Sequence, residues 1–324
     1  MPEIRVDPLS GHKTIVAGER SRRPGGEPRC VPPDPIDPEQ DPFAEGHEQR
    51  TPPELYGVRP DGGPPNSPGW TVRVVPNLYP ALALDRTNRQ PDSRPELFTA
   101  TPATGAHEVI VNAPDPVTSL ADLTVAQLSG AVEVWRERMR AHADASCLHL
   151  FVNEGAGSSQ PHTHGQLLAF EFVPADIARE RERFGAYATR TMGGNLLSDL
   201  VQQEVRRRER IVAIDSEAVL MSAYAARVPY QMTLAPRTAR MRFEDDGPAG
   251  AALLHEALGR LRRALGVMPA LNLWVRTAPR GAEHYCWRID ILPRLFGVGA
   301  VELGVGIDVN PVTPEAAAAA LRGD

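Results

Sequence analysis

The chain has 324 residues, which is enough for one large domain or two fused smaller units. Its 42% hydrophobic and 23% charged residues are typical of a soluble globular protein, and a net charge of -6 excludes a globally basic nucleic-acid-binding surface. No apolar run approaches the roughly 18 residues of a membrane span. The first residues lack the basic and then apolar pattern of a signal peptide, so we expect a cytoplasmic protein.

The first predicted segment, residues 22–69, is rich in proline and glycine and should be extended and loop-rich. Residues 70–75 and 108–111 are β-branched and apolar, which predicts two strands. Residues 123–145 repeat apolar side chains at helical spacing, with Thr124 as a plausible N-cap. A strand at 148–152, a Gly/Ser loop and a second apolar run at 167–170 follow.

The rest of the chain begins with charged residues 179–210, which suggest helices around a turn at 195–197. A strand at 231–234, an amphipathic helix at 250–265 and strands at 271–275 and 287–291 then repeat the earlier order. This repetition suggests an internal duplication of a helix–strand–loop–strand unit, with a common element order shared by chance as the alternative. A terminal helix is predicted at 315–321.

The segment 161–166 carries the chemistry-bearing residues His162, His164 and Gln166. On a strand these three side chains would point the same way. The small residues just upstream, 155–159, would let backbone N–H groups approach an anion closely. A neutral imidazole beside a bound phosphate can displace pyrophosphate or a sugar phosphate and form a phosphoramidate.

Gln166 decides what happens next, because a glutamine donates a hydrogen bond but cannot supply or remove a proton. The covalent intermediate would then wait for a phosphate acceptor rather than react with water. Two other interpretations stay open: two scattered polar residues on a half-buried strand, and a two-histidine metal site. The duplicate copy has Cys286 and Arg288 at the matching positions, so only the first copy would keep the chemistry.

This segment, with Asn153 and the Gly157-Ser158-Ser159 loop, resembles the active-site signature of galactose-1-phosphate uridylyltransferases, the transferase branch of the histidine-triad superfamily. Weaker likenesses run along the chain at residues 5–11, 20–24, 75–82 and 302–310. The resemblance implies an α+β fold of two fused histidine-triad-like units, mostly antiparallel sheet with flanking helices. We expect these units to be residues 1–172, with the catalytic motif, and residues 173–324, a degenerate copy.

The resemblance also implies roles for individual residues. His164 would be the nucleophile and Gln166 the donor to a phosphoryl oxygen. Substrate contacts would come from the following residues: the phosphate loop with Asn153, Gly157, Ser158 and Ser159; Arg20 and Arg23 near the phosphates; Asn77 by the nucleoside; Glu302 at the hexose hydroxyls; and Asn310 in the C-terminal sugar-phosphate loop.

The implied reaction belongs to galactose and carbohydrate metabolism. A nucleotide sugar such as UDP-glucose gives UMP, or another nucleoside monophosphate, to His164, and a sugar 1-phosphate then takes it. Family members are commonly dimers, so a homodimer is expected, with no nucleic-acid or membrane partner.

The family's structural zinc is not expected here. The resemblance places a Cys-x-x-Cys pair at 41–44, where the chain has Asp-Pro-Phe-Ala, and a histidine at Pro116. Only His162 of the implied ligands remains, and one imidazole cannot hold a tetrahedral zinc. Ligands could be rebuilt from Cys30, His47 or His107, but we predict neither a metal nor another cofactor.

Other activities remain open at this point. The phosphate loop is shorter than the family's common form, which puts galactose specificity in doubt more than nucleotidyl transfer. One alternative is a phosphorylase that uses inorganic phosphate on an ADP-sugar or a dinucleoside polyphosphate. Another is a specialised or non-catalytic nucleotide-binding relative in secondary metabolism. Tyr285 and Trp287 are expected in the core rather than in a base pocket, and Arg288 is either a phosphate ligand or an ion-pair residue.

Overall fold

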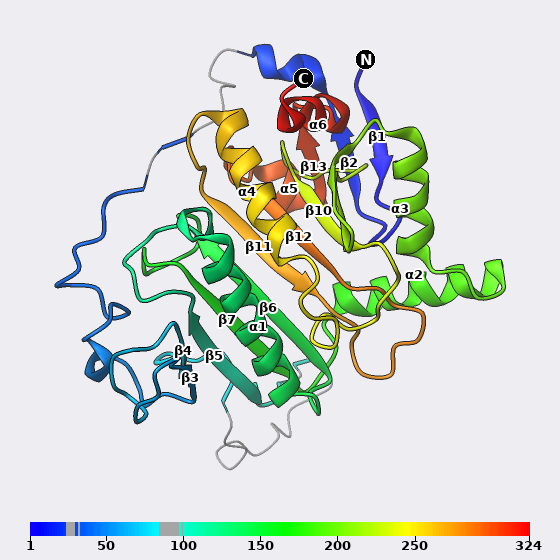
Figure 1. Ribbon diagram of the computed structural model, residues 1–324. Coiled ribbons are helices and arrows are strands. Elements are labelled where there is room, and N and C mark those ends of the chain that lie inside the picture. Colours follow the sequence, from blue (N-terminus) through cyan, green and yellow to red (C-terminus); the bar gives the residue numbers. More distant parts are fainter. Residues whose placement is uncertain (24–29, 32, 84–96, 99) are drawn as a thin grey trace.

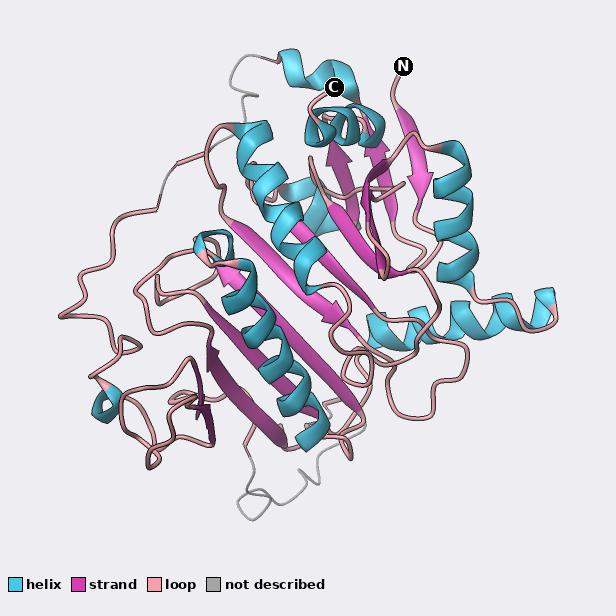
Figure 2. Cartoon of the chain, in the orientation of Figure 1, coloured by secondary structure: helices cyan, strands magenta, loops and turns pink. Residues whose placement is uncertain are grey.

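The computed structural model describes the chain except residues 24–29, 32, 84–96 and 99. Its described strands form a ten-stranded sheet, in the order β3-β4-β5-β7-β6-β11-β12-β10-β9-β8, and a three-stranded sheet, β1-β2-β13. Helices flank these sheets (Figure 2), which confirms the predicted α+β class. Within the described residues no helix is long and apolar enough to span a membrane.

The large sheet contains the same arrangement twice. The first half has β4 (Val72–Pro76), β5 (Gly105–Val111), α1 (Val125–Ala141), β6 (Cys147–Glu154) and β7 (His164–Phe170). The second has β9 (Ala218–Ser222), β10 (Met232–Pro236), α4 (Ala251–Leu265), β11 (Leu271–Arg276) and β12 (Arg288–Pro293). The spatial orders β4-β5-β7-β6 and β9-β10-β12-β11 are equivalent, and the halves join where β6 pairs antiparallel with β11. This repeated order supports the predicted duplication without proving its origin.

The remaining elements complete the edges. β3 (Tyr56–Val58) and β8 (Ile211–Ile214) are the outer strands of the large sheet. β1 (Glu3–Val6) and β2 (Lys13–Val16) pair with each other, and β2 pairs in parallel with β13 (Ile307–Asn310). The N-terminal strands thus lie with the C-terminal end of the chain (Figure 1), and the division at residues 172 and 173 stays a prediction.

The other helices are α2 (Ala175–Thr191), α3 (Leu196–Arg207), α5 (Ala300–Val305) and α6 (Pro314–Arg322). Three short 3-10 helices are η1 (Gly18–Arg22), η2 (Glu48–Arg50) and η3 (Leu120–Asp122). The helix pair predicted around residues 195–197 is confirmed as α2 and α3, with Asn195 capping α3. Residues 302–306, expected in a loop, fall mostly in α5.

Helix α1 forms where the sequence predicted it. Thr124 caps its first turn by accepting from the Gln127 N–H, and the Gln127 side chain caps back in return. The buried face of α1 repeats every three to four residues, with Leu128, Val132 and Trp135 almost fully buried. Figure 1 shows α1 and α4 side by side on one face of the large sheet.

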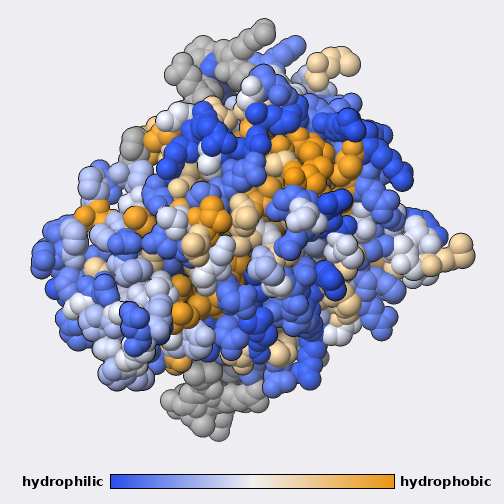
Figure 3. Space-filling view, in the orientation of Figure 1, coloured by the Kyte–Doolittle hydropathy of each residue, from blue (hydrophilic) through white to orange (hydrophobic). Residues whose placement is uncertain are grey.

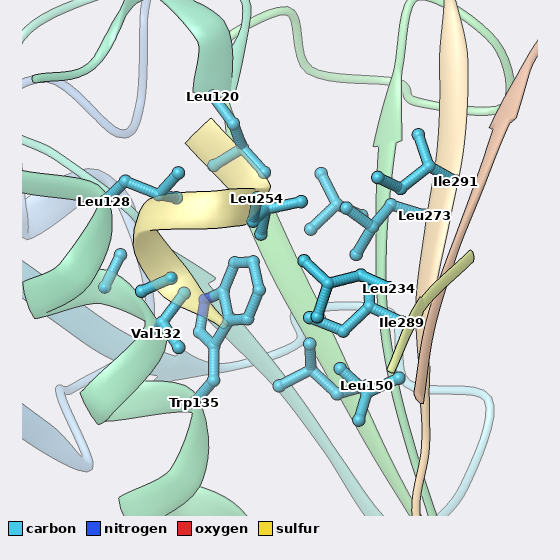
Figure 4. Packing of buried hydrophobic residues seen from close by; sticks show 14 of the residues in the cluster. Leu120, Leu128, Val132, Trp135, Leu150, Leu234, Leu254, Leu273, Ile289 and Ile291 are labelled. Atoms are coloured by element: carbon cyan, nitrogen blue, oxygen red, sulfur yellow. The ribbon is translucent and has the colours of Figure 1, made fainter. Parts of the chain in front are cut away.

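The core lies between these two helices and the sheet. Figure 4 shows Leu128, Val132, Trp135 and Leu254 pointing at strand residues from both halves. Those strand residues are Leu150, Leu234, Leu273, Ile289 and Ile291. One hydrophobic cluster therefore spans both halves of the molecule. On the surface seen in Figure 3, hydrophobic residues form separate patches among hydrophilic ones.

A buried arginine also links the halves. Arg136 of α1 is 1% exposed, stacks over the Phe243 ring and donates to the carbonyls of Phe243 (3.1 Å) and Ala249 (2.6 Å). Burial lowers the pKa of Arg136, because its acceptors are backbone carbonyls and the nearest carboxylate, Glu133, is 3.7 Å away. The opposite face of the sheet is left for polar side chains of alternate strand residues.

Candidate active site

His164 is the first residue of β7 and lies between the strands β5 and β6. Its neighbour Gly165 faces α1, where a Cβ atom would meet Trp135 Nε1 at 3.4 Å. Because side chains alternate along a strand, His164 and Gln166 both project from the other face. The strand begins at His164, so His162 and Thr163 precede it. The expectation that His162 shares the strand alternation of His164 and Gln166 therefore does not hold.

The ring of His164 has a fixed tautomer. Its Nδ1 lies 2.8 Å from the backbone carbonyl of His162, which can only accept, so Nδ1 carries the hydrogen. Nε2 then keeps its lone pair. Burial lowers the pKa of His164, the hydrogen bond to His162 raises it, and the nearby His162 ring lowers it again. The net lowering keeps the imidazole neutral near pH 7, as a nucleophile requires.

The loop after β6 has two bound carbonyls and several N–H groups without an acceptor in the described residues. Asn153 Nδ2 donates to the Gly157 carbonyl at 3.2 Å, and Asn272 Nδ2 donates to the Ala156 carbonyl at 2.9 Å. Gly155 and Gly157 have φ angles of 68° and 80°, which favour glycine. In the described part of the chain, no acceptor pairs with the N–H groups of residues 157–159. Such a loop is suited to an anion.

A buried carboxylate fastens this loop to the histidine segment. Glu154 accepts from the Ser119 hydroxyl (2.7 Å), the Leu120 N–H (2.6 Å) and the Thr163 hydroxyl (3.1 Å). Burial raises the pKa of Glu154 to about 7, although these three donors act in the opposite direction. Glu154 thereby ties η3, the end of β6 and the residue between the two histidines into one unit.

The side chain of Gln166 is held from β5. His107 Nδ1 accepts from the Ala81 N–H at 3.0 Å, so its Nε2 carries the hydrogen and donates to Gln166 Oε1 at 2.9 Å. The Gln166 amide nitrogen is consequently the end that is left for another acceptor. Asn77 Nδ2 lies 3.2 Å from the same His107 Nε2, and Asn77 Oδ1 accepts from the Tyr79 N–H.

His162 makes a different set of contacts. Its Nδ1 lies 2.6 Å from Asp41 Oδ2 and its Nε2 lies 2.9 Å from the Ala113 carbonyl, with His162 0% exposed. Burial would raise the pKa of Asp41, but hydrogen bonds from His162 and the Phe43 N–H outweigh it and lower that pKa. The Phe43 ring then packs edge-on against His164, with ring centroids 5.2 Å apart.

Comparison with known proteins shows which proteins this chain is similar to. Residues 58–174 match the family model described as galactose-1-phosphate uridyl transferase, N-terminal domain. ADP-glucose phosphorylase of Arabidopsis thaliana is 28% identical over 99% of this chain and 92% of its own length. Galactose-1-phosphate uridylyltransferase of Rattus norvegicus is 27% identical over 98% of this chain and 86% of its own.

A crystal structure of an ADP-glucose phosphorylase from Arabidopsis thaliana with bound ADP-glucose has a TM-score of 0.81 at 25% identity, covering 100% of this chain and 99% of that one. A structure of uridylyltransferase has a TM-score of 0.74 at 23% identity, over 100% and 98%, and shows the shared fold alone. The chain is thus similar along nearly its whole length to proteins of the galactose-1-phosphate uridylyltransferase family, and the family's N-terminal domain matches residues 58–174. At the level of reaction class, these similarities indicate a nucleotidyltransferase or phosphorylase.

The residues present do not fit the zinc site that the family implies. Both ring nitrogens of His162 are already engaged, Nδ1 with Asp41 Oδ2 and Nε2 with the Ala113 carbonyl, so neither is directed at an open position for a metal. The candidate replacements do not converge on it: His47 contacts the Asp41 carbonyl, and His107 contacts Gln166. No group of three or more His, Cys, Asp or Glu residues in the described part could hold a metal ion.

Four predicted substrate residues have no direct link to this centre within the described part of the chain. Arg20 and Arg23 are exposed at and after η1, and the Glu302 carboxylate caps the Gly299 N–H at 2.9 Å at the start of α5. Asn310 is 1% exposed and donates to the Ala226 and Val228 carbonyls. Across the described residues, no hydrogen bond or ion pair joins any of these four to His164 or to the phosphate loop. Within one chain, the predicted site residues thus form two separate groups.

Two aromatic residues of the second half, Tyr285 and Trp287, lie in the core. Tyr285 and Trp287 are 0% exposed, and their polar ends donate to Glu180 and Asp246. Arg288 is an ion-pair residue, because its guanidinium binds both oxygens of Glu180 at 2.9 and 3.1 Å. The guanidinium of Arg288 therefore has no free pair of N–H donors for a phosphate.

The sequence interpretation missed several residues of the site. From sequence, Asp41 and His107 enter only in connection with the metal ligands, and no motif singles out Glu154 or Asn272. A signal for Asn272 did exist, because Leu271, Leu273 and Val275 are apolar at every second position and leave Asn272 and Arg276 on the open face of the sheet. No local pattern marks Asp41, whose partner lies 121 residues away.

Proposed function

We propose that the chain transfers a nucleoside monophosphate from a nucleotide sugar to a phosphate acceptor through a covalent intermediate on His164. The observation that carries the proposal is the neutral ring with a free Nε2, fixed by the His162 carbonyl next to a loop of unpaired N–H groups.

In the first step Nε2 attacks the α-phosphorus, a P–N bond forms, and the P–O bond to the sugar phosphate breaks. In the second step an acceptor phosphate oxygen attacks the same phosphorus and the P–N bond breaks, which restores neutral His164. Neither step removes a proton from a carbon or a hydroxyl group, and this agrees with a glutamine rather than an acid or base at Gln166.

The other proposed roles belong to residues around the same site. We propose that the Gln166 amide nitrogen donates to a phosphoryl oxygen, and that the N–H groups of Gly157, Ser158 and Ser159 hold the phosphate. Asn153 keeps that loop in shape through the Gly157 carbonyl. Asn77, half-buried at the end of β4, faces the nucleoside.

Two donor and acceptor pairs compete. The end-to-end similarity to ADP-glucose phosphorylase favours ADP-glucose with inorganic phosphate. UDP-glucose with a hexose 1-phosphate is the second candidate, and the family model and the rat uridylyltransferase favour it.

A second copy of the chain is part of this proposal. Arg20, Arg23, Glu302 and Asn310 are kept as substrate-binding candidates, but one chain does not connect them to His164. They could serve the reaction if a homodimer brings them to the partner's loop. For Asn310 the role would be to hold the shape of its segment, since its amide and its backbone carbonyl are both used internally. Light scattering should show a dimer, and a fully active monomer would rule this part out.

The test of the chemistry is a mass measurement on the intact protein. After incubation with ADP-glucose or UDP-glucose without acceptor, we expect a mass gain equal to AMP or UMP less one water, according to the donor used. The adduct should be lost in His164→Ala and kept in His284→Ala, which changes an exposed histidine away from the site. An unmodified wild-type protein under every nucleotide-sugar donor would reject the proposal and favour a binding protein without catalysis.

A further inference from the structure

Arg294 follows β12 on the open face of the sheet. Its backbone N–H donates to the Ala270 carbonyl at 2.7 Å, which continues the pairing of β12 with β11. Two-residue alternation then places its side chain on the same face as Asn272, and the guanidinium Nη1 donates to Asn272 Oδ1 at 3.2 Å. Both residues come from the second copy, which has lost the histidine motif.

Asn272 connects Arg294 to the phosphate loop. While its oxygen accepts from Arg294, its Nδ2 donates to Asn153 Oδ1 at 2.8 Å and to the Ala156 carbonyl at 2.9 Å. One amide thus orients the guanidinium and fixes the loop at the same time. This chain of hydrogen bonds crosses from the second half of the molecule into the first.

Arg294 also carries a charge without a carboxylate partner. It is half-buried, and no Asp or Glu in the described part of the chain lies within ion-pair distance of it. Arg262, at the edge of a cavity beside the same loop, pairs instead with Asp122 at 2.5 Å. Arg288 is neutralised by Glu180 and Asp290. A fixed, half-buried guanidinium without a counter-ion is suited to an anionic ligand.

The strand register gives the distance scale. Asn272 pairs with Asn153 across β11 and β6, and His164 stands one residue beyond the pair Val152–Gly165 across β6 and β7. Neighbouring antiparallel strands bring paired Cα atoms to about 5 Å, so the His164 and Asn272 backbones are about 10 Å apart on one face. The Arg294 guanidinium bound to Asn272 therefore lies beside the phosphorus that His164 would attack, at the distance of a neighbouring phosphate.

We propose that Arg294, oriented by Asn272, binds the second phosphate of the reaction. This is the phosphate that leaves with the sugar in the first step and the acceptor phosphate that attacks in the second. The inference rests on the proposed function and adds a substrate-binding residue from the degenerate copy. A guanidinium binds a phosphate bidentately, with a geometry that an ammonium group cannot match.

The experiment compares wild type with Arg294→Gln, and inorganic phosphate is the probe. Calorimetric titration should show phosphate binding at least tenfold weaker in the variant, because one charge-assisted contact is lost. The KM for phosphate in discharging the nucleotidyl adduct should rise by the same factor, with kcat changed less. Arg294→Lys should fall between the two. Arg263→Gln, which alters an exposed arginine on α4, should behave as wild type.

Asn272→Asp provides a second variant in case Arg294→Gln does not fold. Its carboxylate would pair with Arg294 and should also weaken phosphate binding at least tenfold. Equal phosphate affinity in wild type and Arg294→Gln would overturn the inference, even if the His164 adduct forms normally. Arg294-dependent phosphate binding without any adduct would support the inference and reject the transfer reaction instead, so the two failures are distinguishable.

Discussion

A single hydrogen bond sets which end of Gln166 meets the substrate. His107 donates from Nε2 to Gln166 Oε1, and the Ala81 N–H fixes the His107 tautomer from the other side of the ring. Without that donor the Gln166 amide could turn over and present its oxygen to a phosphoryl oxygen, which would be repulsive. His107 therefore acts on the reaction through another residue.

Replacing His107 by phenylalanine should lower kcat for adduct formation by about a hundredfold, the lower end of the roughly 10²–10³ found when a transition-state donor is lost. The KM for the nucleotide sugar should change little, because the loop that holds the phosphates is untouched. His107→Gln keeps an N–H donor and should recover part of the rate. Stopped-flow single-turnover measurements separate the two effects, and a KM change without a kcat change would show that His107 serves binding alone.

At this scale, sequence identifies the reacting residues better than the residues that support them. His164, Gln166 and the Gly/Ser loop lie within a dozen residues of each other and share a recognisable spacing. Asp41 meets His162 across 121 residues, and Asn272 meets Asn153 across 119. Contacts of that range depend on which strands pair, so no local pattern in the sequence can indicate them.

Among the elements, α2 is fixed to the second half of the sheet by one buried carboxylate. Glu180 binds Arg288 through two hydrogen bonds, accepts from the Tyr285 hydroxyl at 2.8 Å and lies 3.6 Å from Arg276. Burial would raise the pKa of Glu180, but the charges of Arg288 and Arg276 and these hydrogen bonds lower it to about 2. The carboxylate is therefore ionised in the native state at any ordinary pH.

The low pKa of Glu180 makes part of the stability dependent on pH. An unfolded glutamate titrates near 4.3, so a native pKa of about 2 corresponds to roughly 3 kcal/mol. This contribution is present above pH 4.3 and is lost as the pH falls through about 2. Glu180→Gln should lower the free energy of unfolding by about 3 kcal/mol at pH 7, measured in urea, with a smaller difference from wild type at pH 3.

Two results would contradict this account of α2. An unfolding free energy unchanged by Glu180→Gln at pH 7 would mean that the ion pair does not stabilise the helix against the sheet. A difference that stays constant from pH 7 to pH 3 would mean that side-chain shape, rather than charge, is responsible. Glu182→Gln is the matched control, because Glu182 is exposed on the same helix and has no ion-pair partner among the described residues.

The elements that could be predicted are those with a strong period or cap. Helices α1 and α4 and the strands β6 and β11 occur where the spacing placed them, within a few residues. The resemblance implies a loop at residues 302–306, where the structure has most of α5. No strong sequence signal marks this helix, because it has only six residues, contains Gly304 and buries none of its side chains. Short outer strands such as β8 and β1 carry too few residues for a period to emerge.

On the scale of the whole molecule, the repeat was visible in sequence but its assembly was not. The order of elements in the two halves could be read along the chain. The antiparallel junction of β6 with β11, which brings Asn272 to the phosphate loop, follows only from the folded sheet. The same is true of β2 beside β13, which carries Arg20 and Arg23 away from His164.

A continuous sheet and a shared core predict that both halves unfold together. Fluorescence can report each half separately, since Trp70 and Trp135 belong to the first half and Trp274 and Trp287 to the second. The double variants Trp274→Phe/Trp287→Phe and Trp70→Phe/Trp135→Phe leave one reporting pair each. Within each variant, the urea midpoint from fluorescence should coincide with that from far-UV circular dichroism, as in a two-state transition.

The comparison is made inside each variant because the buried tryptophans stabilise the core and their loss lowers both midpoints together. Arg136→Met provides the sharper test, since it removes the buried guanidinium that joins α1 to the Phe243 and Ala249 carbonyls of the second half. The core cluster and the β6–β11 pairing still connect the halves, so we expect this variant to unfold in one transition at lower urea. Separate midpoints for the two tryptophan pairs in the wild-type background would show instead that the halves are independent folding units, and that the boundary near residues 172 and 173 is a real domain boundary.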